Sequence, residues 1–203
     1  MFIQFIGPGG AGKTTIAKQL APKIDAVCLD LDEYFLRIEG DIALYIQQNG
    51  YLAYARRNIA LYQQLRGSIQ PGKSAILVCS SGFMTYALDQ DAEYQAIKHR
   101  LLSEAYSYVL LPSLNKKQCI DLIVQRQLSR AYLQTNAEKE FLKISRRFDQ
   151  YTSLACPKVM TQDKPENIVN FFNDALISAE MLKKEALTKN KRPISVKNLR
   201  NIK

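Results

Sequence analysis

Apolar residues follow two different spacings along this chain. Short apolar runs predict strands at 2–6, 26–29, 75–79, 108–111 and 159–160. Longer segments, in which apolar residues recur every three or four positions, predict helices at 13–21, 42–48, 51–65, 91–103, 116–129, 138–154 and 165–184. Because strands and helices alternate, the pattern predicts an α/β fold with a central parallel sheet of about five strands and helices on both faces.

The core is expected to be one domain spanning residues 1–182. The chain has 203 residues, of which 47% are hydrophobic, a size and balance that suit a single buried core. No linker divides it, and turn signals at 70–72, 111–113 and 156–157 only separate neighbouring elements.

Most of the net charge of +9 lies at the carboxyl end. Residues 183–203 hold eight lysines and arginines against Glu185 alone, so they carry seven of the nine net charges. This segment has few large apolar residues and no aromatic one, so we expect a flexible basic tail. The basic charge is therefore not built into a nucleic-acid-binding face of the fold, and an anionic partner could bind only through the tail.

Several function classes are disfavoured by what the sequence lacks. The apolar start at 2–6 is too short for a signal sequence, and no apolar run reaches the roughly 18 residues that cross a bilayer. The four cysteines show no metal-ligand spacing, so we expect reduced thiols and a cytoplasmic protein. His99 is the only histidine, which leaves no basis for a Ser-His-Asp or Cys-His mechanism.

A phosphate-binding loop follows the first predicted strand. The segment Gly7-Pro8-Gly9-Gly10-Ala11-Gly12-Lys13-Thr14 matches the P-loop pattern completely and precedes a predicted helix. Glycines let backbone N–H groups close around phosphate at the positive helix end, Lys13 adds charge at the β- and γ-phosphates, and the Thr14 hydroxyl can bind Mg²⁺. The loop predicts binding of a nucleoside triphosphate, most simply MgATP.

Two aspartates follow the second predicted strand. In the segment Asp30-Leu31-Asp32, the two-residue period of a continuing strand would turn both carboxylates to the same face. Ligands of open parallel sheets bind beyond the carboxyl ends of the strands, where the P-loop would also lie. One carboxylate is expected to hold the Mg²⁺ water shell and the other to bind an attacking hydroxyl; a solvated strand end is the alternative.

Taken together, these segments resemble the shikimate kinase family of small P-loop enzymes, which phosphorylate a hydroxyl group with MgATP. The similarity spans about residues 1–180, through the P-loop, Asp30-Leu31-Asp32, the glycines at 40 and 50, Val109-Leu110-Leu111, an arginine-containing lid near 130–137, and Arg147-Phe148-Asp149. It implies a three-layer P-loop fold with a small lid.

The resemblance also implies roles for individual residues. Nucleotide binding falls to Gly7, Gly9, Gly10, Ala11, Gly12, Lys13, Thr14, Thr15 and the lid residue Arg130. Thr14 and Asp30 would hold the metal. Lys13, Asp32 and Arg130 would act in catalysis, Asp32 by holding the acceptor hydroxyl, and Arg147 would pair with an acceptor carboxylate.

Two departures from the family pattern fall on the acceptor side. The family has an aromatic residue followed by arginine after the glycine at 50, whereas here Tyr54 is followed by Ala55, and Arg56 comes one position later. One position turns a helical side chain by about 100°, so Arg56 would need a local rearrangement to take that place. Where the family has three glycines after the third strand, this chain has Ser80-Ser81-Gly82, so only the last of the three positions is still a glycine.

The sequence therefore predicts a monomeric, shikimate kinase-like phosphotransferase with an altered acceptor site, whose substrate is a small hydroxylated compound that can carry a carboxylate. A kinase for another metabolite or a nucleotide stays open. Two further alternatives also stay open. One is a nucleotide-dependent ATPase or switch that acts on a partner through the tail, and the other is a family member that binds ATP without catalysing transfer.

Overall fold

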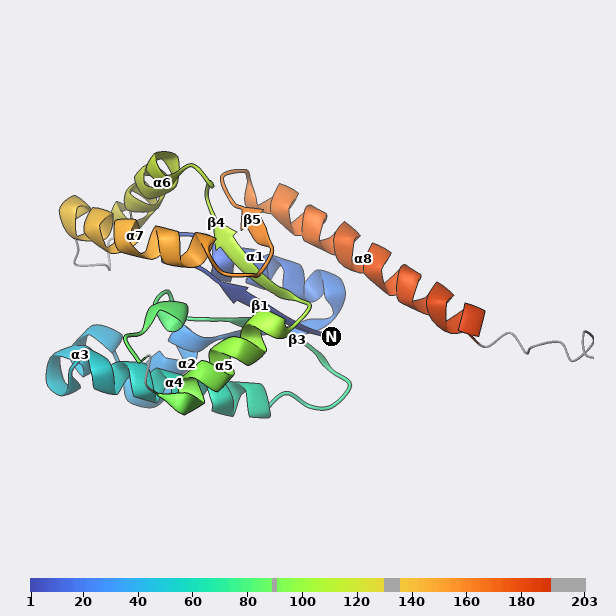
Figure 1. Ribbon diagram of the computed structural model, residues 1–203, viewed down its shortest axis with the longest axis horizontal. Helices are drawn as coiled ribbons and strands as arrows, with labels where there is room; N and C mark the ends of the chain where they lie inside the picture. Colours follow the sequence, from blue (N-terminus) through green and yellow to red (C-terminus); the bar gives the residue numbers. More distant parts are fainter. Residues whose placement is uncertain (89–90, 130–135, 191–203) are drawn as a thin grey trace, which may run out of the picture.

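The computed structural model describes residues 1–88, 91–129 and 136–190, which form one α/β body (Figure 1). Its strands are β1 (Phe2–Ile6), β2 (Ala26–Asp30), β3 (Ser74–Val78), β4 (Ser107–Leu111) and β5 (Lys158–Met160). Its α-helices are α1 (Lys13–Leu20), α2 (Leu31–Glu39), α3 (Ile42–Asn49), α4 (Tyr51–Gly67), α5 (Ala92–Ser103), α6 (Lys116–Leu128), α7 (Ala137–Thr152) and α8 (Pro165–Asn190). Two 3₁₀ turns, η1 (Ala21–Ile24) and η2 (Phe83–Thr85), complete the described elements.

The five strands form one parallel sheet in the order β2-β3-β1-β4-β5. β1 lies at the centre, where its apolar run is covered on both sides. Since every strand points the same way, the loops that follow the strands gather at one edge of the sheet. This confirms the predicted fold class.

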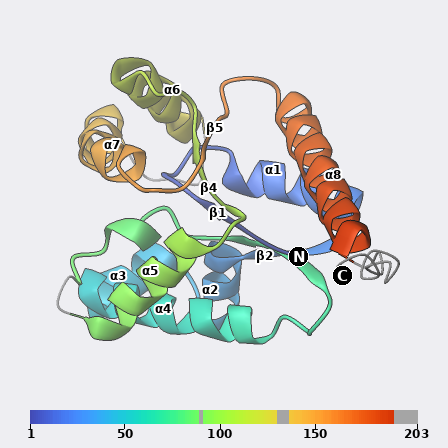
Figure 2. The same ribbon diagram turned by 45° about the vertical axis from the view of Figure 1, so that its right-hand side comes forward.

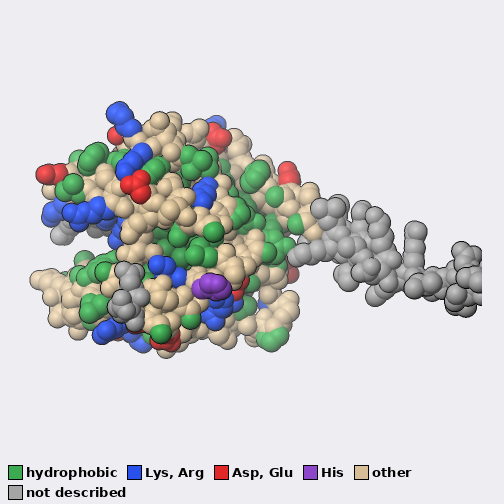
Figure 3. All heavy atoms as spheres, in the orientation of Figure 1, with side chains coloured by type: hydrophobic (Ala, Val, Ile, Leu, Met, Phe, Trp, Pro, Cys, Tyr) green, Lys and Arg blue, Asp and Glu red, His purple; other side chains and the backbone are tan. Residues whose placement is uncertain are grey.

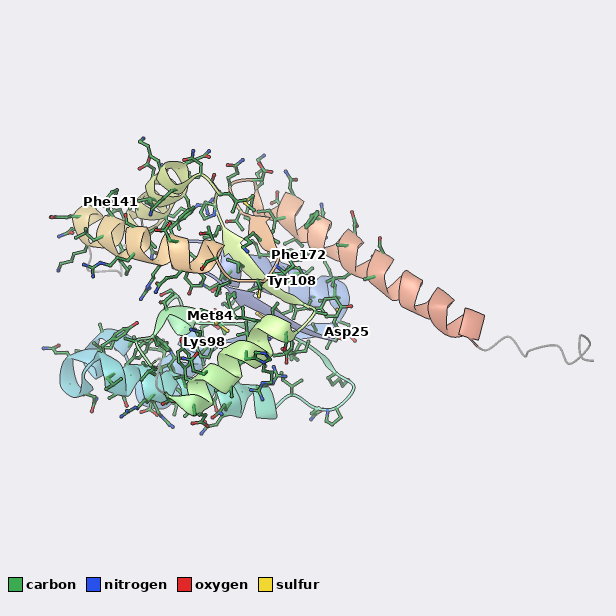
Figure 4. The ribbon with its side chains drawn as sticks, in the orientation of Figure 1. Asp25, Met84, Lys98, Tyr108, Phe141 and Phe172 are labelled. Atoms are coloured by element: carbon green, nitrogen blue, oxygen red, sulfur yellow. The ribbon has the colours of Figure 1, made fainter. Side chains whose placement is uncertain are left out.

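The two faces of the sheet are covered by different helices (Figure 2). Ile3 and Phe5 of β1 pack with residues of α1 and α8, while Ile6 belongs to the larger core formed with α2 and α4 to α7. Figure 4 shows Tyr108 of β4 beside Phe172 of α8, with ring centroids 5.0 Å apart. The alternation along each strand thus produces the expected three layers.

The prediction that the second strand continues through Asp32 is wrong. The chain does not stay extended through Asp32: it turns into α2 at Leu31, a helix that the apolar pattern did not predict. The Asp30 carboxylate caps this helix by accepting hydrogen bonds from the backbone N–H groups of Asp32 and Glu33, at 2.9 and 3.2 Å. Because an aspartate cap stabilises a helix start, the second aspartate lies in a first helical turn and not on a strand face.

The last helix is longer than its sequence pattern predicts. It was expected to end at residue 184 but continues to Asn190, into the segment for which the composition predicts flexibility. Residues 191–203 of that segment lie outside the described ranges.

Among the described helices, none combines the length and the apolar character that crossing a membrane requires. All four cysteines are free thiols: Cys79, Cys119 and Cys156 are buried, and Cys28 is half-buried.

Candidate active site

The P-loop connects β1 to α1 at the carboxyl edge of the sheet. Gly7 has φ +141°, and a Cβ there would collide with the carbonyl oxygen of Leu110. Gly12 takes a left-handed φ of +86° as the residue before α1, whose first turn contains no acidic side chain. Only glycine fits at position 7, and glycine takes the conformation at position 12 without strain. The loop thus places backbone N–H groups at the start of a helix whose own first turn carries no acidic side chain.

Lys13 lies folded over this loop. It is buried, and its Nζ donates to the carbonyl oxygens of Gly7 and Pro8 at 2.7 and 3.0 Å. The loop thereby holds an ammonium group at the place where backbone N–H groups collect, an arrangement suited to a polyphosphate.

Thr14 and Asp30 join the P-loop to the end of β2. The Thr14 hydroxyl donates to Asp30 Oδ2 at 2.7 Å, while Asp30 Oδ1 caps α2. A hydroxyl and a carboxylate side by side are hard oxygen ligands of the kind that Mg²⁺ prefers. No group of three or more His, Cys, Asp or Glu side chains in the described residues could hold a metal. The donor set fits an ion that relies on water and substrate phosphate, as Mg²⁺ usually does.

A cavity of about 380 Å³ opens beside the P-loop and has room for a nucleoside. Arg126 on its wall donates from Nη1 to the Gly10 carbonyl at 3.2 Å and from Nη2 to the Thr161 carbonyl at 2.8 Å. The buried Thr161 Oγ1 has no hydrogen-bond partner among the described residues. Further lining residues are Gly12, Thr15, Asp163 and Pro165.

Sequence reasoning missed the contribution of 161–165 to this cavity. These residues directly follow β5, so the rule that ligands bind beyond the carboxyl ends of parallel strands points to them once β5 is recognised. A cavity of about 440 Å³ elsewhere is lined by Ala26 and Ser74, which begin β2 and β3, so it lies at the opposite edge.

Asp32 lies in the first turn of α2, close to the metal-binding candidates. Its side chain is exposed, yet desolvation by the surrounding protein raises its pKa, and the negative charge of Asp30 acts in the same direction. The nearby Ser80 hydroxyl and the charge of Lys13 oppose that rise. Asp30 and Asp32 therefore do lie close together at the sheet edge. They do so because Asp30 caps α2 and Asp32 lies in its first turn, not because both lie on one face of a strand.

On the acceptor side, α7 reaches the segment that follows β3. Arg147 Nη1 donates to the Ser81 carbonyl oxygen at 3.3 Å, and Nη2 donates to the Tyr51 hydroxyl at 3.4 Å. Tyr151 fixes the same carbonyl with a 2.8 Å hydrogen bond. A Cβ on Gly82 would lie only 2.9 Å from the Tyr51 hydroxyl and 3.1 Å from Arg147 Nη2. Gly82 and Arg147, two candidate substrate-binding residues, thus face the same small space.

Residues 54–57 of α4 are the segment that departs from the family pattern. Ala55 is buried in the core, Arg56 is exposed, and Arg57 pairs with Glu39 at 2.5 Å. Arg56 is not brought against Gly82 or Arg147 by any described contact, so its substrate role stays a prediction. Arg130 and the rest of the expected lid at 130–135 lie outside the described residues.

The space-filling view is hollowed between the part of the molecule that contains α6 and α7 and the part that contains α3 and α4 (Figure 3). The P-loop and the 81–82 segment belong to the sheet edge between these two parts.

Residues 9–176 match the family model described as shikimate kinase. The chain belongs to the shikimate kinase family. This assignment makes it an ATP-dependent small-molecule kinase by family and confirms the resemblance found from the motifs.

Solved shikimate kinases share the fold. The enzyme from Acinetobacter baumannii, solved in complex with shikimate, is 22% identical with a TM-score of 0.67, covering 88% of this chain and 93% of its own. That from Bacteroides thetaiotaomicron is 14% identical with a TM-score of 0.66, covering 87% and 98%.

A deoxyadenosine kinase from M. mycoides is a more distant structural neighbour, 15% identical with a TM-score of 0.52, covering 88% of this chain and 100% of its own. No curated protein sequence matches the chain.

Proposed function

We propose that this protein transfers the γ-phosphoryl group of ATP to a hydroxyl group of a small molecule, as a shikimate kinase-like enzyme with an altered acceptor site. The observation that carries the proposal is the 2.7 Å contact between Thr14 and Asp30, which joins the P-loop to the helix turn that holds Asp32. A phosphate site and a hydroxyl-orienting carboxylate thereby share one edge of the sheet.

On the nucleotide side, the P-loop backbone and Lys13 bind the phosphates. Lys13 would exchange its two carbonyl partners in the loop for phosphate oxygens, which are better partners for an ammonium group. The base would occupy the cavity beside Thr15 and Arg126. Thr14 and Asp30 would hold Mg²⁺, which when bound neutralises phosphate charge.

On the acceptor side, Asp32 orients the attacking hydroxyl and accepts its proton. Its raised pKa makes this carboxylate a better proton acceptor than an ordinary aspartate. Arg147 would bind an anionic group of the acceptor beside Gly82, and Arg56 would add a second charge at the mouth of the site. Arg130 would reach the ATP phosphates from the lid.

The acceptor itself can differ from shikimate. Ala55 is buried where the family pattern has an arginine, and Ser80 and Ser81 stand where the pattern has glycines. These observations favour, as a second candidate function, a kinase for another hydroxylated metabolite that uses the same chemistry.

The deciding experiment measures ATP consumption by the purified protein with Mg²⁺, with and without shikimate, against Lys13→Ala as background. A shikimate-dependent rate supports the narrower function. ATP binding with no shikimate dependence, followed by turnover with another hydroxylated compound in a metabolite screen, supports the second. ATP binding without transfer to any acceptor would refute both.

A further inference from the structure

A buried glutamine of α6 packs against the P-loop. Gln127 is only 5% exposed. Its Nε2 lies 2.5 Å from the position that a Cβ on Gly9 would take, and its Cγ lies 3.5 Å from the corresponding position on Gly10. Because Gly9 has no Cβ, the side-chain amide can approach the backbone of the loop closely.

One end of this amide has no partner in the part of the protein that the structure describes. Gln127 Oε1 is buried, and no hydrogen bond reaches it from the described residues. The buried face of α6 is otherwise formed by Cys119, Ile120 and Ile123. Since an unpartnered buried polar atom is destabilising, a leucine would fill this position at lower cost. An amide at this place is therefore suited to hydrogen-bond a ligand of the loop.

The position of Gly9 points to the terminal phosphate of a bound nucleotide. The cavity proposed for the base is lined by Gly12 and Thr15. Lys13, which in a P-loop contacts the β- and γ-phosphates, places its Nζ at the carbonyl oxygens of residues 7–8, directly before Gly9. A triphosphate that starts at the base cavity is therefore expected to end near Gly9.

The acceptor side also reaches Gly9. Ser81 Cβ lies 3.6 Å from the same Cβ position on this glycine. The carbonyl oxygen of Ser81 accepts the hydrogen bonds from Arg147 and Tyr151 that shape the acceptor side. Gly9 thus lies where the nucleotide side meets the acceptor side, and a phosphoryl group passed from one to the other must lie at this boundary.

We propose that Gln127 is a ligand of the γ-phosphate, with Nε2 donating a hydrogen bond to a terminal phosphate oxygen. The proposal rests on the nucleotide binding of the proposed function. The amide is neutral, so it adds a directed donor to the charge that Lys13 supplies. Because only the triphosphate extends to Gly9, this donor discriminates ATP from the diphosphate product.

The test measures, by calorimetry with Mg²⁺, the dissociation constants of ADP and of a non-hydrolysable ATP analogue. Gln127→Leu removes the amide and keeps a side chain of similar size. The dissociation constant of the ATP analogue should rise about ten-fold, as expected when a hydrogen bond to a charged group is lost. The dissociation constant of ADP should stay within about two-fold. Equal weakening of both nucleotides, or no change in either, would overturn the proposal.

A control variant and a stability measurement separate ligand binding from a structural role. Gln125→Leu is the matched control, since Gln125 lies on the same helix but is exposed, and it should change neither constant. Because Gln127→Leu removes an unpartnered buried carbonyl, its Tm should equal or exceed that of the wild type. A lower Tm with weaker binding of both nucleotides would assign the amide to the structure of the loop and refute the proposal.

The binding measurement does not depend on phosphoryl transfer. If the wild type phosphorylates an acceptor but Gln127→Leu keeps the wild-type ratio of the two dissociation constants, the inference fails and the proposed function stands. If no acceptor is phosphorylated but the ratio changes about ten-fold in Gln127→Leu, the proposed transfer fails and the role of Gln127 stands.

Discussion

The nucleotide side and the acceptor side of this site are held together in different ways. The P-loop consists of eight consecutive residues, and the ligands proposed there are backbone N–H groups, one lysine and one threonine. The acceptor side uses side chains from α2, α4, α7 and the segment after β3, and its contacts join residues 66 to 96 positions apart.

This difference affects how readily the sequence of each side of the site can diverge. Backbone ligands in a short loop depend on local conformation, so divergence elsewhere leaves them intact. Side chains that converge from four elements depend on the packing of those elements, and one exchanged residue alters the pocket. Both departures from the family pattern lie on the acceptor side, in agreement with this contrast. Substitutions on the two sides should therefore affect different kinetic constants.

The largest effect is expected from Lys13→Ala. Removing the ammonium group should lower the transfer rate by about 10³-fold, because this charge lies over the P-loop, the proposed phosphate site. Steady-state kinetics would measure the loss, with circular dichroism to show that the fold persists. Lys18→Ala is the matched control, since Lys18 is on the same helix but is exposed and paired with Glu33. Normal turnover by Lys13→Ala would exclude the P-loop mechanism.

Asp32→Asn should lower kcat by about 10²-fold and leave ATP affinity unchanged. The amide keeps the shape of the side chain but is a poor proton acceptor, and Asp32 does not belong to the P-loop. Single-turnover kinetics would measure the transfer step and calorimetry the binding of ATP. Unchanged acceptor kinetics would remove Asp32 from the site.

Arg147→Lys is expected to raise the KM of an anionic acceptor about ten-fold and to leave the KM of ATP unchanged. Lysine keeps the charge but loses the planar pair of donors that matches a carboxylate. Arg146→Lys provides the control, because Arg146 is the exposed neighbour on α7. Equal effects of the two substitutions would contradict a specific role for Arg147.

The smallest effect is expected from Arg57→Ala. Its pair with Glu39 is partly exposed, so its loss should lower the free energy of unfolding by less than about 1 kcal/mol, without changing the KM of the acceptor. Urea unfolding and initial rates would check both parts. A raised acceptor KM would move the substrate role from Arg56 to Arg57.

Much of the fold could be predicted from the sequence. The apolar run at 2–6 and the strands at 75–79 and 108–111 lie in the sheet within one residue of their expected bounds, because buried parallel strands are continuous apolar segments. The start of α2 was not predicted, since Asp30-Leu31-Asp32 suits a strand by its period and a helix by its cap. The hydrogen bonds that Asp30 accepts decided between the two.

The sequence by itself determined the P-loop and the parallel α/β architecture, because both follow from local patterns of glycine, charge and apolar spacing. Only the tertiary structure decided that Arg147 meets Ser81 and Tyr51, that residues 161–165 close a cavity beside the P-loop, and that Gln127 reaches Gly9. These contacts join segments distant in the chain, and the packing of helices on the sheet, which no short window of sequence specifies, brings them together.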